Sequence, residues 1–366
     1  MTAPLKVCYV SPNAHLGGAE RIVEILLKYH DRKKVVPTVV FLKNGPLVSK
    51  WHDLGVETFV TSPFRLRSPA TLLNACSEFK SFAQEKQFDV IHSHLSYGHL
   101  FSTLALRGVR ARRVWFQHGP VGKGLDWGAG YLPADAIFFN SNYTRSLQTV
   151  AGSKLSYVVY GPVEKPVATN ERQQIRHAIR ANFGFNENDI VLLHVGRMDP
   201  WKGQDFLLKA FAKIREQNSK VKLVFFGDSN IGSSDYAASL LKQTAEINLT
   251  SAVHFAGFES DLEKIYSVAD IFIQASQIPE PLGLSVLEAQ IRSLPVVAVN
   301  AGGTAEIVMH EVNGLVYEQN SEAGLIKSIL RFVESSELRL KLAAGAAESA
   351  AKLEAQAWTK TIESYY

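Results

Sequence analysis

Short apolar runs alternate along the chain with longer stretches whose apolar residues recur at helical spacing. Runs of this length, bounded by turn residues, are typical of buried parallel strands, and the helical period is typical of the helices that cover them. The predicted strands are residues 5–10, 35–41, 58–60, 89–94, 113–118, 136–139, 158–160, 190–195, 221–226, 253–258, 270–274 and 295–299. Predicted helices include 19–29, 47–54, 69–86, 171–183, 204–217 and most of 323–366. This alternation indicates βαβ units and parallel sheets.

The chain is long enough for two such domains. Its 366 residues can bury two full cores. A proline-rich segment, residues 161–166, interrupts the alternation and reads as a hinge. We therefore expect a first domain over 1–163 and a second over 164–351, with the remaining residues as a terminal helix.

The charge is unevenly divided between these halves, although the net charge is only +4. Residues 1–160 hold 19 Lys and Arg against 10 Asp and Glu, whereas residues 161–366 hold 20 against 25. A basic first half is compatible with solvated loops and helix faces. It is equally compatible with contact to anionic lipid headgroups or to a phosphate-bearing acceptor. Nucleic acid is disfavoured because no recognisable nucleic-acid module accompanies the charge.

The number of cysteines and the hydropathy of the chain indicate the cellular compartment of the protein. Cys8 and Cys76 have no metal-site spacing, and two thiols in a chain of this size fit a reducing compartment. Residues 1–6 run directly into a strand without a signal-peptide pattern. No apolar run approaches the roughly 18 residues that span a bilayer. We expect a cytoplasmic protein, either free or resting on the inner face of a membrane.

The largest group of candidate site residues lies within residues 276–308. Glu280 follows a buried strand, Glu288 lies in the next helix, and a second strand leads into the glycine loop 301–304. Two neighbouring strand-to-helix turns offer free backbone N–H groups at one sheet edge, which suits an anion. If the helix starts near residue 284, Glu288 lies roughly 6 Å further along its axis. The two carboxylates could then bind different parts of one extended polar ligand.

Two further turns carry residues suited to phosphate. Gly17 and Gly18 follow the first strand, and although they do not form a dinucleotide fingerprint, glycines let a phosphate approach the backbone. A plain turn is the alternative. Arg197 and Lys202 lie five residues apart on a glycine-bounded turn before a helix, which suits a diphosphate leaving group. A surface basic pair is the alternative there.

Histidines end two of the predicted strands. His92, His94 and His99 suggest a metal site, but no cysteine or carboxylate completes a ligand set, so packing and loop hydrogen bonds are favoured. His94 could still reach a cleft. His118 ends the strand at 113–118, and a side chain there points to the crevice at the carboxyl edge of the sheet.

Taken in order, these motifs resemble the retaining, nucleotide-sugar-dependent glycosyltransferases of family 4, also called glycosyl transferases group 1, which have the GT-B fold. The resemblance covers nearly the whole chain. It rests on 17–20 (GGAE), 118–119 (HG), 141–145 (SNYTR), 196–203 (GRMDPWKG) and the Glu-x7-Glu pair at 280 and 288. It implies an α/β fold of two Rossmann-like domains that face each other across a cleft, with a final helix, about 352–366, returning to the first domain.

The resemblance also implies roles for the residues that match. In the first domain, Gly17 and Gly18 would close over the donor diphosphate, and His118 would contact the transferred sugar near the reacting carbon. In the second domain, Arg197 and Lys202 would bind the diphosphate. They would be helped by the backbone amides of Gly283, Leu284 and Ser285.

The remaining donor contacts follow from the same resemblance. Glu280 would accept hydrogen bonds from sugar hydroxyls and Glu288 from ribose hydroxyls, for which carboxylates are well suited. The turn at Gly257 and Phe258 would seat the nucleobase, whose identity the side chains there do not reveal. Leu282 and Ser293 depart from the family, which often has phenylalanine and glycine at these positions.

The implied activity is transfer, with retention of configuration, of a hexose-type sugar from a UDP- or GDP-sugar. The acceptor would be a glycan or a lipid-linked molecule in the assembly of cell-surface polysaccharide, lipopolysaccharide or glycolipid. No cofactor and no metal are expected, because protein cations take the charge of the leaving group and no Asp-x-Asp strand end is present.

Two alternatives remain open: a sugar-nucleotide epimerase of the same fold, and a catalytically silent sugar-nucleotide-binding subunit. A catalytically silent subunit would be expected to have lost site residues, yet four are present: Glu280, His118, Arg197 and Lys202.

Overall fold

The computed structural model describes residues 3–119, 122, 124–149, 155–227 and 234–366. Contacts divide the chain into two units. The first ends at Pro162 and takes in Ala355–Tyr366, and the second is Val163–Glu354. The sequence placed these boundaries at 163/164 and at about 352.

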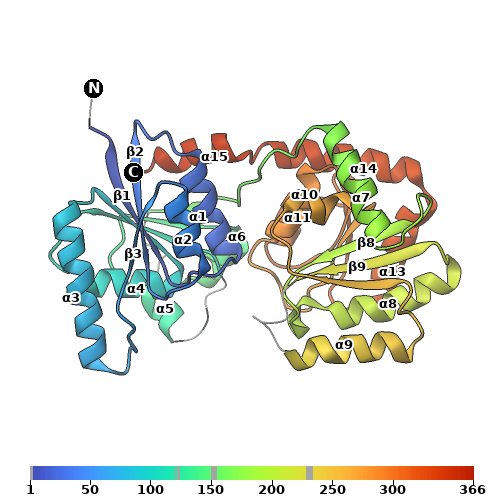
Figure 1. The fold of residues 1–366 in the computed structure, drawn as a ribbon, viewed down its shortest axis with the longest axis horizontal. Coiled ribbons are helices and arrows are strands. Elements are labelled where there is room, and N and C mark those ends of the chain that lie inside the picture. Colours follow the sequence, from blue (N-terminus) through green and yellow to red (C-terminus); the bar gives the residue numbers. More distant parts are fainter. Residues whose placement is uncertain (1–2, 120–121, 123, 150–154, 228–233) are drawn as a thin grey trace. The chain divides into compact units, whose positions relative to one another are not determined.

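The first unit is built on a parallel sheet. Within the described residues its strand order is β3-β2-β1-β4-β5-β6-β7. The strands are β1 Leu5–Ser11, β2 Val35–Phe41, β3 Glu57–Val60, β4 Val90–His94, β5 Arg112–Gln117, β6 Ala136–Phe139 and β7 Ser156–Val158. The helices around it (Figure 1) are α1 Gly18–Tyr29, α2 Pro46–Asp53, α3 Pro69–Lys86, α4 Leu95–Ala105, α5 Leu125–Ala129, α6 Asn142–Leu147 and α15 Ala355–Glu363.

The second unit repeats this plan with the strand order β10-β9-β8-β11-β12-β13. Its strands are β8 Ile190–Val195, β9 Val221–Phe226, β10 Val253–Gly257, β11 Ile271–Gln274, β12 Val296–Val299 and β13 Leu315–Tyr317. Its helices (Figure 1) are α7 Thr169–Asn182, α8 Gln204–Gln217, α9 Ser234–Glu246, α10 Leu262–Ser267, α11 Leu284–Ile291, α12 Thr304–Ile307, α13 Glu322–Glu334 and α14 Ser336–Ala351.

Both sheets form because their strands are apolar on both faces. The central strands β1, β8 and β12 contribute side chains that are almost wholly buried, as is usual for parallel sheets covered by helices on each side. All strand pairs are parallel, so the carboxyl ends of the strands share one edge in each unit. The predicted fold class, two Rossmann-like α/β domains, is confirmed, and the candidate site residues follow those carboxyl ends.

The last helix returns to the first unit, as predicted. α15 packs against α1, and Nε1 of Trp358 donates a hydrogen bond to the Tyr160 carbonyl at 2.6 Å. The hydroxyl of Tyr366 lies 2.8 Å from that of Tyr9 and 2.7 Å from Nδ1 of His92, two side chains that are fully buried. These buried polar contacts tie the end of the chain to β1 and β4.

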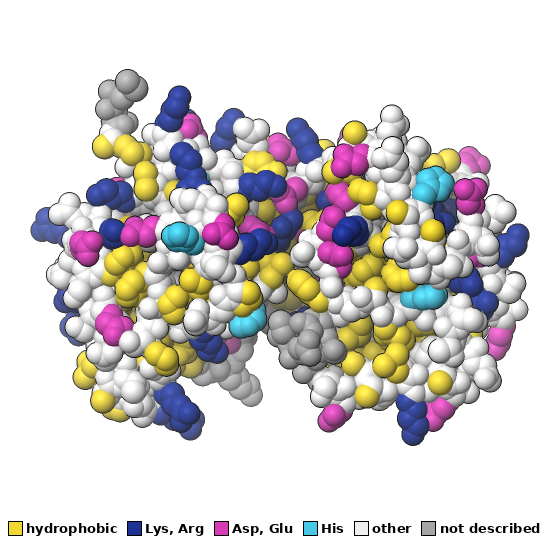
Figure 2. Space-filling model, in the orientation of Figure 1, with side chains coloured by type: hydrophobic (Ala, Val, Ile, Leu, Met, Phe, Trp, Pro, Cys, Tyr) yellow, Lys and Arg dark blue, Asp and Glu magenta, His cyan; other side chains and the backbone are white. Residues whose placement is uncertain are grey.

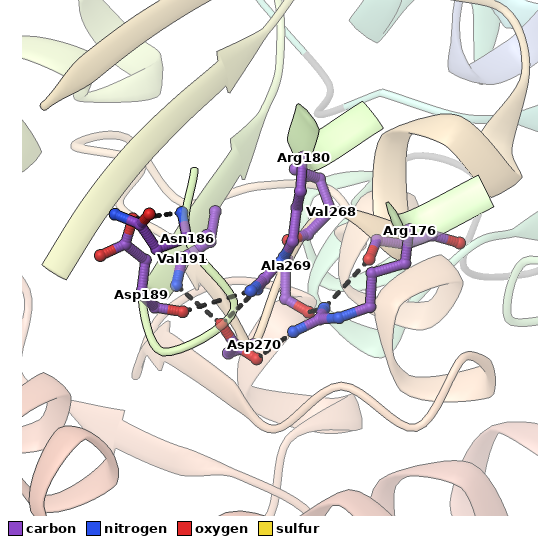
Figure 3. A network of polar contacts seen from close by, with 9 residues as sticks. Arg176, Arg180, Asn186, Asp189, Val191, Val268, Ala269 and Asp270 are labelled. Carbon is purple, nitrogen blue, oxygen red and sulfur yellow. Dashed lines mark hydrogen bonds and ion pairs between the residues drawn. The ribbon is translucent and has the colours of Figure 1, made fainter. Parts of the chain in front are cut away.

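In the second unit, α7 is fastened to the sheet by an arginine network (Figure 3). Arg176 and Arg180 each place a guanidinium nitrogen on Asp270, at 2.6 and 2.5 Å. The same carboxylate accepts the backbone N–H of Val191 at 2.8 Å, and Arg176 also donates to the Ala269 carbonyl at 2.7 Å. Asp270 therefore fixes the starts of β8 and β11 against α7.

One local prediction was wrong in detail. The strand expected at 158–160 is β7, Ser156–Val158, because Ser156 pairs with Ile137 and the Tyr160 carbonyl instead accepts from Trp358.

On one face of the molecule, the basic residues of the first half form no single patch (Figure 2). On the face shown in Figure 2, Lys and Arg side chains of the first unit are scattered among acidic ones. Among the described residues, no helix is long and apolar enough to cross a membrane.

Candidate functional site

Glu280 is the most firmly held acidic side chain of the candidate site. It is 6% exposed, and its Oε1 accepts hydrogen bonds from Nζ of Lys202 at 2.8 Å, Oγ of Ser276 at 2.5 Å and Nε2 of Gln274 at 3.4 Å. All three contacts reach Oε1, whereas Oε2 makes none to the residues that the structure describes. One oxygen is thus an anchor and the other is available to a ligand.

The electrostatics of this cluster keep Glu280 charged. Burial alone would raise its pKa, but the charge of Lys202 and the hydrogen bonds from Lys202, Ser276 and Gln274 outweigh burial and hold the pKa below its ordinary value. The ammonium group of Lys202 also lies 4.2 Å from the ring centre of Trp201, in cation–π geometry. A paired carboxylate and ammonium therefore stand together at the end of the sheet.

The turn that carries Lys202 is pressed against the strand end before Glu280. Gly203 has a φ of +75°, and a Cβ there would lie 2.0 Å from the Ala275 carbonyl oxygen, so only glycine fits. The backbone N–H of Gln277 donates to the Trp201 carbonyl at 2.7 Å. These contacts explain how residues that lie far apart in the sequence are brought together.

The glycine loop predicted at 301–304 packs on the other side of Glu280. The backbone N–H of Gly303 donates to the Glu280 carbonyl at 2.8 Å, and Gly302 has a φ of +63°. A Cβ on Gly302 would lie 2.4 Å from that carbonyl oxygen, and one on Gly303 would lie 2.1 Å from the Pro281 oxygen. The loop and the Glu280 backbone form one rigid turn.

The next helix, α11, begins directly beside this turn. Gly283 precedes it with a φ of +95° and, being glycine, has no side chain to cap the helix start. The positive end of the helix, with the first amides at Leu284 and Ser285, is therefore left for an anion. The structure thus brings the turns at 196–203 and 280–285 together, as the sequence predicted.

Glu288 is held by a tyrosine that the sequence analysis did not single out. The hydroxyl of Tyr266, which is fully buried in α10, lies 2.8 Å from Oε2 of Glu288. The guanidinium of Arg292 stands 5.3 Å from the Tyr266 ring centre and forms a buried ion pair with Glu263 at 2.6 Å. Glu288 and Glu280 are thus fixed by separate sets of partners.

Three further predicted residues of the second unit are exposed. The side chain of Arg197 makes no hydrogen bond or ion pair within the described part of the chain. Gly257 ends β10 with a φ of +74°, and the next side chain, Phe258, is 60% exposed. An exposed cation and an exposed aromatic ring are both available to a ligand.

The first unit places Gly17 and Gly18 at the start of α1. Gly17 is the residue before the helix, without a capping side chain, and Gly18 is its first residue. The carboxyl group of Glu20 is folded over this turn, since a Cβ on Gly17 would lie 2.8 Å from Oε2 of Glu20. Burial raises the pKa of Glu20 to about 7, against the lowering effect of nearby amides.

His118 lies just beyond β5 and is 7% exposed. Its Nε2 lies 2.7 Å from Nδ1 of His94, at the end of the neighbouring strand. His92 bonds to Tyr366, and His99 stacks on Trp115 with ring centres 4.7 Å apart. Within the described residues, no three His, Cys, Asp or Glu side chains are grouped as metal ligands would be.

The sequence alone did not identify several residues of these clusters. The sequence could have pointed to Gln274, because it is a polar residue at the end of an otherwise apolar strand. It could not have pointed to Ser276 or Tyr266, since serine in a loop and tyrosine in a helix are common. Their partners, Glu280 and Glu288, identify them only once the chain is folded.

Two sequence families match this chain. The family described as "Glycosyltransferase Family 4" matches residues 16–164, and the one described as "Glycosyl transferases group 1" matches residues 175–349. The matches fall on the first and the second unit.

Curated relatives agree with these matches. The "Lipopolysaccharide 1,2-N-acetylglucosaminetransferase" of Salmonella typhimurium is 27% identical over 70% of this chain and 66% of its own length. The "D-inositol 3-phosphate glycosyltransferase" of Salinispora arenicola is 28% identical over 53% of this chain and 44% of its own. For several such relatives the match spans about half of their length.

The fold also matches solved structures over nearly the whole chain. The Anabaena protein Alr3699/HepE, described in complex with UDP and glucose, superimposes with a TM-score of 0.86 at 22% identity, covering 99% of each chain. This likeness shows the GT-B fold. Together with the family matches and the paired glutamates of the second unit, it leads to one conclusion: the chain belongs to the family 4 glycosyltransferases.

Proposed function

We propose that this protein transfers a hexose-type sugar, with retention of configuration, from a UDP- or GDP-sugar to a glycan or lipid-linked acceptor. The observation that carries the proposal is the anchored Glu280. Its Oε1 is occupied by Lys202, Ser276 and Gln274, so its Oε2 is left to accept hydrogen bonds from sugar hydroxyls. UDP-glucose is the first donor to test, because the Anabaena relative is described in complex with it.

The geometry of the second unit supports the other proposed contacts of the donor. Arg197 and Lys202 bind the diphosphate, with the first amides of α11 beside them, and neutralise the charge that develops on the leaving phosphate. Glu288, held by Tyr266, accepts hydrogen bonds from the ribose hydroxyls. The exposed ring of Phe258 stacks on the base.

The remaining roles belong to the first unit. His118 contacts the transferred sugar, and Gly17 and Gly18 approach the diphosphate. The departing phosphate oxygen takes the proton of the acceptor hydroxyl, so no protein nucleophile is required. The cationic side chains of Arg197 and Lys202 neutralise the charge of the leaving phosphate, and we propose that no metal is needed.

The acceptor is proposed to be part of a cell-surface glycan. The match to a lipopolysaccharide N-acetylglucosaminetransferase supports this class, and the basic charge of residues 1–160 suits an anionic or membrane-held acceptor. Flotation with vesicles of phosphatidylcholine, with and without phosphatidylglycerol, tests the membrane part. Equal binding to both vesicles would contradict it.

The donor proposal is tested with purified full-length protein and a panel of UDP-, GDP- and ADP-sugars. Calorimetric binding and slow donor hydrolysis are measured with and without EDTA. We expect one nucleotide sugar to bind and turn over regardless of EDTA, and Glu288→Ala to weaken its binding. Glu334→Ala, which changes an exposed carboxylate of α13, is the matched control. A folded protein that binds none of these donors would overturn the proposal.

A further inference from the structure

His94 and His118 form a buried pair at the carboxyl edge of the first sheet. His94 ends β4 and His118 follows β5, the neighbouring strand. Nδ1 of His94 lies 2.7 Å from Nε2 of His118, and the rings lie within 6° of parallel with centres 5.0 Å apart. The side chain proposed to touch the sugar thus already has a hydrogen-bonded partner.

Both rings are neutral at pH 7. Burial lowers the pKa of His94 to about 3. Burial, together with the nearby His94, holds the pKa of His118 well below its ordinary value. A neutral imidazole has one N–H and one bare nitrogen, so only one hydrogen lies between the two rings. The two tautomers are therefore coupled: either Nδ1 of His118 or Nε2 of His94 carries the other proton.

The surroundings of His94 favour one of these arrangements. Its ring lies among those of Tyr9, His92 and Phe116, with centres 5.9, 4.6 and 6.1 Å away. Its Nε2 is buried and has no partner among the described residues. An N–H buried without an acceptor is rarer in proteins than a bare acceptor. Nδ1 of His118 is also buried without a partner among these residues, but His118 is 7% exposed against 1% for His94, so a bound ligand can provide an acceptor to His118 and not to His94. The proton of His94 therefore belongs on Nδ1, inside the bond to His118.

The backbone beside His94 is strained. Leu95, the first residue of α4, has a φ of +60°, which costs a residue with a side chain about 1–2 kcal/mol. Such strain persists where the surrounding structure over-determines it, and it gathers at functional sites. Here it lies at the turn that sends the chain from β4 into α4, next to the residue that meets His118.

We propose that His94 is a positioning residue: it donates its Nδ1 proton to Nε2 of His118, so that His118 presents a fixed Nδ1–H donor to a hydroxyl oxygen of the transferred sugar. The consequence for catalysis rests on the proposed function, whereas the tautomer of His118 does not. Nδ1 of His118 is buried and has no partner among the described residues, so the proposal requires that a bound sugar hydroxyl reach this atom and accept its proton.

The tautomer is read by long-range proton–nitrogen NMR on full-length protein labelled with ¹⁵N-histidine at pH 7.5, with His118→Asn to assign the signals. We expect the Nδ1–H form for His118. His94→Leu should convert it to the Nε2–H form, and His94→Asn, whose amide can donate from a similar place, should restore the Nδ1–H form. An Nε2–H form in the unmodified protein, or a tautomer unchanged in His94→Leu, would overturn the proposal.

Kinetics then separates positioning from a merely structural role. Donor turnover should fall at least tenfold in kcat in His94→Leu with little change in KM, and His94→Asn should recover most of it. His99→Phe, which alters another buried histidine of the first unit, should behave like the unmodified protein. An unchanged kcat in a folded His94→Leu with a shifted tautomer would refute the catalytic part. Should the unmodified protein turn over no donor, the transferase proposal fails, and the NMR result still decides the tautomer.

Discussion

Nζ of Lys202 lies 2.8 Å from Oε1 of Glu280, so the two charged groups proposed to meet the donor are paired with each other. Both side chains are largely buried, at 14% and 8% exposure. Removing one partner of a buried pair leaves the other charge uncompensated, at a cost of about 3–5 kcal/mol. We therefore expect Lys202→Met to lower the free energy of unfolding of the second unit by about 3 kcal/mol, measured by urea denaturation at pH 7.5.

The double variant Lys202→Met with Glu280→Gln tests the cause of that loss. It should be more stable than Lys202→Met alone, because no charge is left buried. Lys242→Met, which removes an exposed lysine paired with Glu246, should cost less than about 1 kcal/mol. Equal losses in Lys202→Met and Lys242→Met would show that the buried pair is not what stabilises this turn.

Tyr266→Phe should weaken binding of the nucleoside part of the donor. It removes the hydroxyl that lies 2.8 Å from Oε2 of Glu288 and leaves the buried ring in place. A hydrogen bond to a charged group contributes about 1.5–3 kcal/mol, so we expect at least a tenfold loss in affinity for UDP by calorimetry. Inorganic pyrophosphate, which has no ribose, should bind as before.

Tyr236→Phe is the control for this substitution. It removes another tyrosine hydroxyl that bonds to a carboxylate of the second unit, that of Asp205 at 2.8 Å. UDP affinity should stay within about threefold of the original. A parallel loss of UDP and pyrophosphate affinity in Tyr266→Phe would instead indicate damage to the whole site.

The sequence was sufficient for the strands and most helices because their apolar periods are set by local burial. It also singled out Glu280 and Lys202, since each stands in a recognisable motif, and the structure pairs their side chains. It could not find Gln274 or Ser276 as partners of Glu280, because hydrogen bonds between side chains depend on how strand ends and loops meet in space. The strand at 158–160 was misplaced for a similar reason: the contact of Tyr160 with Trp358 spans nearly two hundred residues.

Ser293 shows how a departure noted in the sequence gains a physical meaning. The residue is exposed at the end of α11 and has a φ of +55°, the left-handed region that glycine occupies freely. Ser293→Gly removes a steric cost of about 1–2 kcal/mol and adds a smaller entropic cost of about 0.5–1 kcal/mol. We expect a gain of up to about 1 kcal/mol in the urea-derived stability of the second unit.

Asn248→Gly provides the comparison for Ser293→Gly. Asn248 follows α9 with a φ of +56° and is also exposed. Asparagine tolerates this conformation better than serine, so the gain should be smaller. A loss of stability in Ser293→Gly would mean that the serine side chain makes a contribution larger than the strain.

The first unit should lose stability as the pH falls below about 6.5. Burial is the main cause that lowers the pKa of four of its histidines: His30, His92, His94 and His118. The unfolded chain therefore binds protons that the folded chain excludes, and each such group steepens the fall by about 1.4 kcal/mol per pH unit. Glu20, whose pKa is raised to about 7, has the opposite effect on stability between about pH 4.5 and 7. It is one group, whereas the histidines are four, so the loss of stability dominates.

Hydrogen exchange of peptides from β1 and β4, measured in urea at pH 7.5, 6.5 and 5.5, follows this unit separately. We expect protection to change little between the first two values and to fall steeply by the third. His94→Asn should make the fall shallower by about 1.4 kcal/mol per pH unit, because one excluded proton is gone. His52→Gln, which changes an exposed histidine of the same unit, should leave the slope unchanged. Constant protection down to pH 5.5 would mean that these histidines take up protons in the folded protein, and the neutral His94–His118 pair would then be wrong as well.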